Sequence, residues 1–131
     1  MTMTTLKLVV GFLLPASVLL AQDAIATAGP EFVVHINEPF YTFETDGDAV
    51  KVISPDDLEG TAVPAVRIDR FGISQVTGVY RNEPFALSIL EQACKDDAGL
   101  LYSRSAIMTL GSTAKDGCAR LTTEPQPREG G

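Results

Sequence analysis

Residues 40–53 read FYTFETDGDAVKVI, and this stretch decides the fold class. Aromatic and β-branched side chains dominate its first part, 40–45, and apolar side chains alternate with other types in its last part, 49–53. The residues between them, Asp46-Gly47-Asp48, are of the types that form tight turns. Two β-rich runs joined by such a turn predict a β-hairpin, so we expect antiparallel strands from the start of the folded part.

The same two-residue period continues after the hairpin and before it. It predicts further strands at 31–36, 65–71, 73–80, 85–92 and 105–110, and a final short strand that contains Cys118 and Ala119. Glycine, proline and aspartate separate these runs, with a loop or a single helical turn capped by Ser54 predicted at 54–60, and turns at 81–84 and 95–99. A helix over residues 85–94 is an open alternative to the strand there.

Short strands repeated about every ten residues are typical of small barrels and sandwiches. We therefore expect an all-β fold, a small antiparallel β-barrel or sandwich of roughly seven to eight short strands with one disulfide. In the strand at 65–71, we expect Val66 and Ile68 to point inward and Arg67 and Asp69 to point outward, since successive side chains lie on opposite faces.

The amino-terminal segment has the pattern of an export signal. Lys7 supplies one positive charge, residues 8–20 run LVVGFLLPASVLL without a charge, and small residues follow between Ala21 and Ala28. This apolar run is short for a membrane span, which takes about 20 residues. We predict a cleaved secretory signal over 1–26 and a periplasmic or secreted location, with an uncleaved anchor or a buried helix as the alternative.

Cleavage would leave one β domain at 30–121 and a tail at 122–131. The tail holds prolines and ends in two glycines, a composition that predicts disorder. No stable membrane span is expected after signal cleavage, and we expect the mature chain to be a monomer.

The chain contains two cysteines, Cys94 and Cys118. An even number of cysteines in an exported chain predicts a disulfide, and neither lies in a C-x-x-C redox motif. Closing a loop of about 25 residues would remove unfolded-state entropy worth roughly 3 kcal/mol. A zinc site is not expected, because His35 is the only histidine and lies far away in the sequence.

The chain is acidic, with a net charge of −7. A cut directly after Ala21 removes Lys7 and leaves nine basic against 17 acidic side chains, a net charge of −8, whereas a cut after residue 26 also removes Asp23 and leaves −7. This charge argues against nucleic acid as a partner, because nucleic-acid binders need a basic face, and against anionic lipid surfaces. It fits a cationic partner, although keeping an exported domain soluble is the simpler explanation.

No pattern of catalytic or metal-binding residues stands out. His35 has no serine or cysteine nucleophile that the sequence pairs with it. The aspartate pairs at 46–48 and 56–57 are explained by turns, and calcium would need six to eight oxygen ligands. We predict no catalytic residue, no metal site and no cofactor.

The tetrapeptide Asn-Glu-Pro-Phe occurs twice, at 37–40 and at 82–85. In both places we expect proline to occupy the first position of a strand, where no N–H donor is needed. A tandem duplication would explain the repeat. The residues that follow, YTFETDGD and ALSILEQA, do not align, so we favour the reuse of a good turn.

The segment Asn37-Glu38-Pro39-Phe40-Tyr41 resembles the N-E-P-F-W box of a family of uncharacterised exported bacterial envelope proteins. Later motifs of that family are C-x-D, a tyrosine and G-C-A. They correspond to Cys94-Lys95-Asp96, Tyr102 and Gly117-Cys118-Ala119, so the resemblance spans roughly residues 36 to 120.

This resemblance has two departures, Tyr41 in place of the box tryptophan and Asp97-Ala98-Gly99 in place of an M-S stretch. The family is similar in size and cysteine placement to small β-barrel lysozyme inhibitors and to META-type heat-shock lipoproteins. The resemblance implies no enzymatic activity. The candidate binding residues that it marks are Asn37, Glu38, Tyr41, Asp96 and Tyr102.

Two classes of function follow from these observations. The first is a non-catalytic exported envelope protein that acts as a binding or inhibitor-like module for a protein or cell-wall component, for example a cationic envelope enzyme such as a lysozyme. The alternative is a carrier or sensor of a small apolar ligand, with a pocket inside the barrel near Tyr41, Phe43 and Phe85. An enzyme is not predicted.

Overall fold

The computed structural model describes residues 29–127. The predicted signal over 1–26 and the last residues of the predicted tail, 128–131, lie outside the described residues. Within 29–127 there is no helix that is long and apolar enough to cross a membrane.

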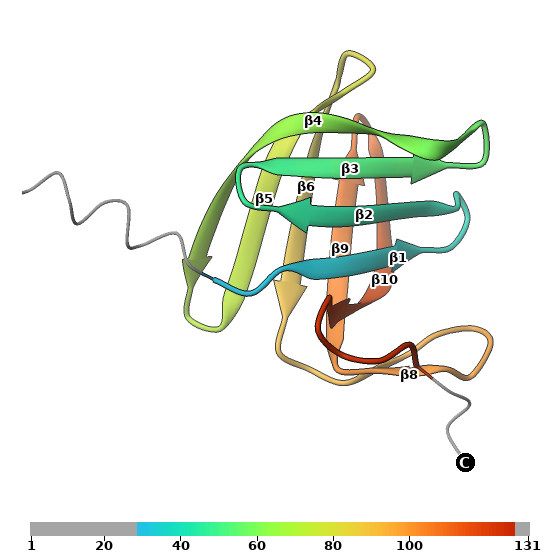
Figure 1. Cartoon of the computed structure of the whole chain (residues 1–131). Coiled ribbons are helices and arrows are strands. Elements are labelled where there is room, and N and C mark those ends of the chain that lie inside the picture. Colours follow the sequence, from blue (N-terminus) through green and yellow to red (C-terminus); the bar gives the residue numbers. More distant parts are fainter. Residues whose placement is uncertain (1–28, 128–131) are drawn as a thin grey trace, which may run out of the picture.

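Eight strands close into one antiparallel barrel (Figure 1). Their order around the barrel is β1-β10-β9-β6-β5-β4-β3-β2. The eight are β1 (Phe32–Ile36), β2 (Tyr41–Asp46), β3 (Ala49–Ser54), β4 (Asp57–Arg70), β5 (Ile73–Tyr80), β6 (Glu83–Leu90), β9 (Arg104–Leu110) and β10 (Thr113–Leu121). The predicted all-β barrel is confirmed, and the strand at 85–92 is confirmed over the helical alternative.

A segment between β6 and β9 lies outside the barrel. This segment, residues 91–103, is called the flap, and it contains a small sheet of β7 (Cys94–Lys95) and β8 (Leu101–Tyr102). The predicted disulfide is confirmed and joins Cys94 of β7 to Cys118 of β10. It therefore fastens the flap to β10, beside the position where Cys118 pairs with His35 of β1.

Neighbouring antiparallel strands place alternate connections at the same end of a barrel. The connections at 37–40, 55–56, 81–82 and 111–112 therefore share one end, called the turn end. The flap leaves the barrel at the opposite end and packs against β10 through the Cys94–Cys118 disulfide and against His35 of β1 through Tyr102. Figure 1 shows β1, β2 and β3 crossing the direction of β5, β6 and β9, with the long β4 passing from one group to the other.

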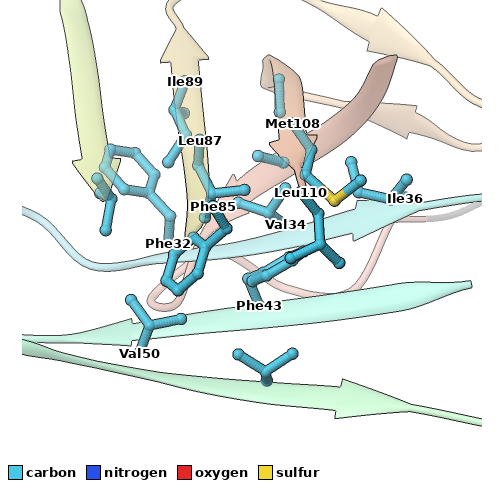
Figure 2. Packing of buried hydrophobic residues seen from close by; sticks show 14 of the residues in the cluster. Phe32, Val34, Ile36, Phe43, Val50, Phe85, Leu87, Ile89, Met108 and Leu110 are labelled. Carbon is cyan, nitrogen blue, oxygen red and sulfur yellow. The ribbon is translucent and has the colours of Figure 1, made fainter. Parts of the chain in front are cut away.

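Apolar side chains fill the interior of the barrel. Val34, Phe43 and Val52 face one another across β1, β2 and β3, and all three are fully buried. The rings of Phe43 and Phe85 lie 5.7 Å apart and join this wall to the opposite one (Figure 2). The remaining members of the cluster come from all parts of the barrel: Phe32, Ile36, Val50, Val76, Tyr80, Leu87, Ile89, Ala106, Met108, Leu110 and Ala119.

The predicted hairpin at 40–53 is confirmed as β2 and β3. Gly47 at its turn has a φ of 64°, a backbone conformation that costs glycine little. The predicted loop at 54–60 is wrong, because the chain turns within Pro55-Asp56 and β4 begins at Asp57. A carboxylate oxygen of Asp57 accepts a hydrogen bond from the N–H of Gly60 at 3.1 Å, and the register between β3 and β4 shifts nearby. These turn-forming residue types therefore build an irregular strand.

The orientation expected for the strand at 65–71 is also wrong. Val66 and Ile68 are 63% and 51% exposed, so both point outward. Arg67 points inward instead, with its guanidinium carbon 5.0 Å above the ring of Phe32 and its Nε donating to Asp69 at 2.9 Å. An arginine can occupy this inward position because it lies near the barrel end, where polar partners reach its guanidinium group.

The final strand is longer than the short strand that was predicted, and it runs from Thr113 to Leu121. Gly117 allows it to approach β1 closely, because a Cβ at this position would overlap the backbone carbonyl oxygen of His35. After β10 the chain turns rather than forming a free tail. The carboxylate of Glu124 accepts hydrogen bonds from Ser103 Oγ at 2.6 Å and from the N–H of Leu121 at 2.7 Å, which fixes the first part of the predicted tail.

The two Asn-Glu-Pro-Phe segments fold differently. Residues 37–40 all belong to a turn, with a cis peptide bond between Glu38 and Pro39, so Pro39 is not the first strand residue that was predicted. In the second segment, Pro84 lies in β6 and pairs with Val79. The tetrapeptides are therefore not equivalent positions of a structural repeat.

Candidate functional site

A shallow depression of about 340 Å³ lies beside the turn end of the barrel. The β1–β2 connection and the adjoining ends of β1, β2, β3 and β4 form its walls. Its lining residues are His35, Ile36, Asn37, Phe40, Tyr41, Thr42, Ile53, Ser54, Pro55 and Leu58.

Two large apolar side chains of this lining are exposed to solvent. Phe40 is 59% exposed and Leu58 is 76% exposed. Phe40 lies in the turn just before β2, and Leu58 lies at the start of β4, just after the Pro55-Asp56 turn. Both therefore stand where two connections meet, outside the interior that the other apolar side chains fill.

Polar contacts hold the wall around Asp56. Its carboxylate accepts a hydrogen bond from Ser54 Oγ at 2.7 Å and forms an ion pair with Arg81 at 3.0 Å. The hydrogen bond from Ser54, with Arg81 next, keeps the pKa of the Asp56 carboxyl below its usual value. The Asp56–Arg81 ion pair therefore joins the β3–β4 and β5–β6 connections, and the Arg81 guanidinium also lies 5.0 Å over the ring of Tyr80.

His35 lies at the edge of the depression that is nearest the flap. Its Nδ1 lies 3.2 Å from the hydroxyl oxygen of Thr42, and its ring centroid lies 5.8 Å from that of Tyr102. Burial, and after it the charge of Arg120, lowers the pKa of His35, while Asp96 and Glu44 oppose that shift. The imidazole is therefore neutral at neutral pH.

The flap places Asp96 and Tyr102 beside His35. One carboxylate oxygen of Asp96 accepts hydrogen bonds from the N–H groups of Ala98 and Leu100, at 3.0 and 2.8 Å. Tyr102 is buried, and this burial, together with the charge of Asp96, raises the pKa of its hydroxyl. Asp96 thus shapes the flap turn, and Tyr102 packs between the flap and β1.

The five candidate binding residues from the sequence therefore have different environments. Asn37 and Tyr41 line the depression, and Glu38 is exposed in the same turn. The ring of Tyr41 also packs toward the interior, with its centroid 5.9 Å from that of Phe43. Asp96 and Tyr102 lie beyond His35, in the flap.

The sequence pattern did not single out Leu58, and it placed Phe40 only at the start of the hairpin and in the Asn-Glu-Pro-Phe tetrapeptide. A signal was present for Leu58, since it is an apolar residue inside the acidic segment Asp56-Asp57-Leu58-Glu59. An apolar side chain in a segment predicted to be a loop has no interior position to occupy, so it marks a candidate contact residue.

No group of three or more histidine, cysteine, aspartate or glutamate side chains within residues 29–127 could hold a metal ion. The site offers apolar contact area, hydrogen-bonding groups such as Asn37, and carboxylates at its rim. Such an arrangement suits the binding of a protein surface. No family model, no curated protein and no solved structure matches this chain.

Proposed function

We propose that the protein is a non-catalytic exported envelope protein that binds a cationic protein partner at the turn end of its barrel. The observation that carries the proposal is the exposure of Phe40 and Leu58 beside one depression. Solvent-exposed apolar side chains of this size, gathered at one place, are typical of protein contact sites.

The charge around these two side chains supports a cationic partner. The acidic residues next to them are Glu38 and Asp56 in the two connections and Asp57 and Glu59 at the start of β4. Apolar anchors provide binding free energy, and an acidic rim accelerates association with a basic surface. A basic enzyme of the cell envelope, such as a lysozyme, has the surface charge that this rim would attract.

The rigidity of the connections also supports a binding role. The hydrogen bond from Ser54 and the ion pair with Arg81 hold Asp56, and residues 37–40 lie between two strands that pair with each other. A surface that is already ordered loses less conformational entropy when a partner binds.

An exported location is part of the proposal and rests on the amino-terminal sequence and on the cysteines. The Cys94–Cys118 disulfide supports it, because disulfides persist in oxidising compartments. The resemblance to the N-E-P-F-W family stays a prediction. The carrier alternative has less support, since Phe43 and Phe85 pack against each other where its pocket was expected.

Binding to a panel of cationic proteins that includes lysozymes tests the proposal. Purified protein is immobilised, and the affinity is measured by biolayer interferometry at low and at physiological salt. We expect binding that weakens as salt screens the acidic rim. The variants Phe40→Ala and Leu58→Ala should each weaken the affinity about tenfold, which corresponds to about 1.4 kcal/mol.

Val79→Ala is the matched control, because Val79 is an exposed apolar residue on a different face of the barrel. It should bind as tightly as the wild type. The proposal fails if no cationic protein binds at low salt. It also fails if Phe40→Ala and Leu58→Ala bind as the control does.

A further inference from the structure

The outer face of β4, β5, β6 and β9 is apolar and carries almost no charge. Strand register and alternation place fifteen side chains on this face, and Arg70, at its border, is the single charged one. The face, called the β5 face, consists of Pro64, Val66, Ile68, Arg70, Ile73, Gln75, Thr77, Val79, Pro84, Ala86, Ser88, Leu90, Ser105, Ile107 and Thr109. This surface belongs to a chain whose net charge is −7.

The β5 face has a raised edge and a low floor. Val66 and Ile68 project from β4, while β6, on the other side of β5, offers the small side chains Ala86 and Ser88. Between them the surface is hollowed over a volume of about 710 Å³, and Val66 and Ala86 are both among the lining residues.

We propose that the β5 face is a self-association surface, on which a second copy of this chain docks about a two-fold axis. In such a pair, the β4 edge of one copy lies over the β6 floor of the other, and the reverse contact forms at the same time. A two-fold contact needs a surface that is complementary to itself, and a ridge beside a groove on one face meets this need.

The polar groups on this face also suit a second copy. Gln75 and Ser88 pair across β5 and β6, near the middle of the face. An amide and a hydroxyl each donate and accept hydrogen bonds, so Gln75 of one copy can satisfy Ser88 of the other and the reverse. If this face carried only hydrogen-bond donors or only acceptors, two copies could form no hydrogen bonds with each other across it.

Charge favours a second copy over a cationic partner here. None of the fifteen side chains is acidic, and the nearest carboxylates lie at the border, on Asp116 of β10, paired with Ile107, and on Glu83, beside Gly111. A face-to-face pair therefore places no carboxylate at the centre of the contact, and it leaves the acidic turn end free for another partner. A cationic protein would lose the solvation of its charges against the β5 face and gain no ion pair in return.

The size of the face sets the strength of the contact. Four strands about 4.8 Å apart and seven residues of about 3.3 Å each cover roughly 440 Å² in projection. Two copies would bury on the order of 900 Å², which is below the size of standard stable interfaces and within the range of weak ones. We therefore expect a dimer with a dissociation constant of about 100 μM, in place of the monomer expected from the sequence.

Sedimentation velocity of the full chain over a concentration series tests the proposal. The wild type should move from the mass of one 14.0 kDa chain toward twice that mass as its concentration rises. The variants Val66→Asp and Ala86→Arg should each weaken the dimer at least about tenfold, because one charges the ridge and the other fills the floor. Both side chains project outward, so both variants should fold.

Leu58→Asp is the matched control. It lies on the same strand, is exposed, and faces the turn end. This variant should dimerise like the wild type and lose the cationic partner, whereas Val66→Asp should keep the partner and lose the dimer. Added salt should strengthen the dimer by screening like charges and weaken partner binding, so the two proposals fail separately.

Three results would overturn the assignment. The wild type could remain monomeric up to about 1 mM, far above the expected dissociation constant. A dimer could form that neither Val66→Asp nor Ala86→Arg weakens. Finally, the wild type could be monomeric while the variant Val66→Asp is cut by protease within residues 1–28 more readily than the wild type. That result would assign the β5 face to binding this segment in place of a second copy.

Discussion

Replacing Phe43 by alanine measures how tightly the barrel interior is packed. Phe43 has no exposed area and lies centrally in β2, between Val34 of β1 and Val52 of β3. Its ring also contacts the opposite wall through Phe85. These neighbours belong to strands that pair on both sides, so they cannot easily move inward to fill the space that the ring leaves.

The expected loss in the free energy of unfolding has two parts. Removing the ring would leave a cavity of up to roughly 100 Å³, which at about 24 cal/mol per Å³ costs about 2.4 kcal/mol. The lost transfer of the apolar ring from water adds about 2 kcal/mol. The sum is about 4 kcal/mol, within the range of about 3–5 kcal/mol measured for such substitutions in other proteins.

Urea denaturation followed by far-ultraviolet circular dichroism measures this loss; the chain contains no tryptophan for fluorescence. Phe71→Ala is the matched control, since Phe71 is 92% exposed and should change stability by less than about 0.5 kcal/mol. A loss below about 1.5 kcal/mol for Phe43→Ala, with an unchanged denaturant slope, would refute the packed interior. That result would revive a hollow barrel and the carrier function.

Three further changes probe other parts of the barrel. Gly117→Ala should cost about 1–3 kcal/mol in urea denaturation, because its Cβ would overlap backbone that no rotamer change can move; a neutral effect would contradict this close approach. Replacing Cys94 and Cys118 together by serine should cost about 3 kcal/mol and accelerate amide hydrogen exchange first in the flap, and unchanged flap exchange would count against its role as a fastening. Because the pKa of His35 is lowered in the folded protein, the imidazole binds a proton more readily when the protein is unfolded, so the free energy of unfolding should fall as the pH drops below about 6.5. His35→Gln should reduce that fall in denaturation curves measured from about pH 7.5 to 5.5, and equal slopes would show that His35 does not contribute.

The prediction of strands succeeded where the signal was local. The hairpin at 40–53 follows from turn residues between two β-rich runs, and both strands and turn were found there. The disulfide followed from the number of cysteines and the expected compartment. The prediction of a loop at 54–60 was wrong. Pro55, Asp56 and Gly60 are residue types common in loops, but pairing with β3 makes most of this segment a strand.

The sequence identified only part of the candidate site. The tetrapeptide box led to Asn37 and Tyr41, which line the depression, but the exposure of Phe40 and Leu58 was not expected. That exposure depends on two connections meeting at one barrel end. Sequence separation alone does not say which connections meet.

Most of the strand positions, the turn at Gly47, the acidity and the cysteine pair follow from the amino-acid sequence, because each depends on neighbouring residues or on composition. Which side of β4 faces inward depends on the tertiary structure. Alternation places Val66 and Arg67 on opposite faces, yet it does not say which face the closed barrel encloses. Closure turned Arg67 inward, over the ring of Phe32, and exposed Val66 and Ile68, and that orientation created the apolar outer face on which the proposed self-association depends.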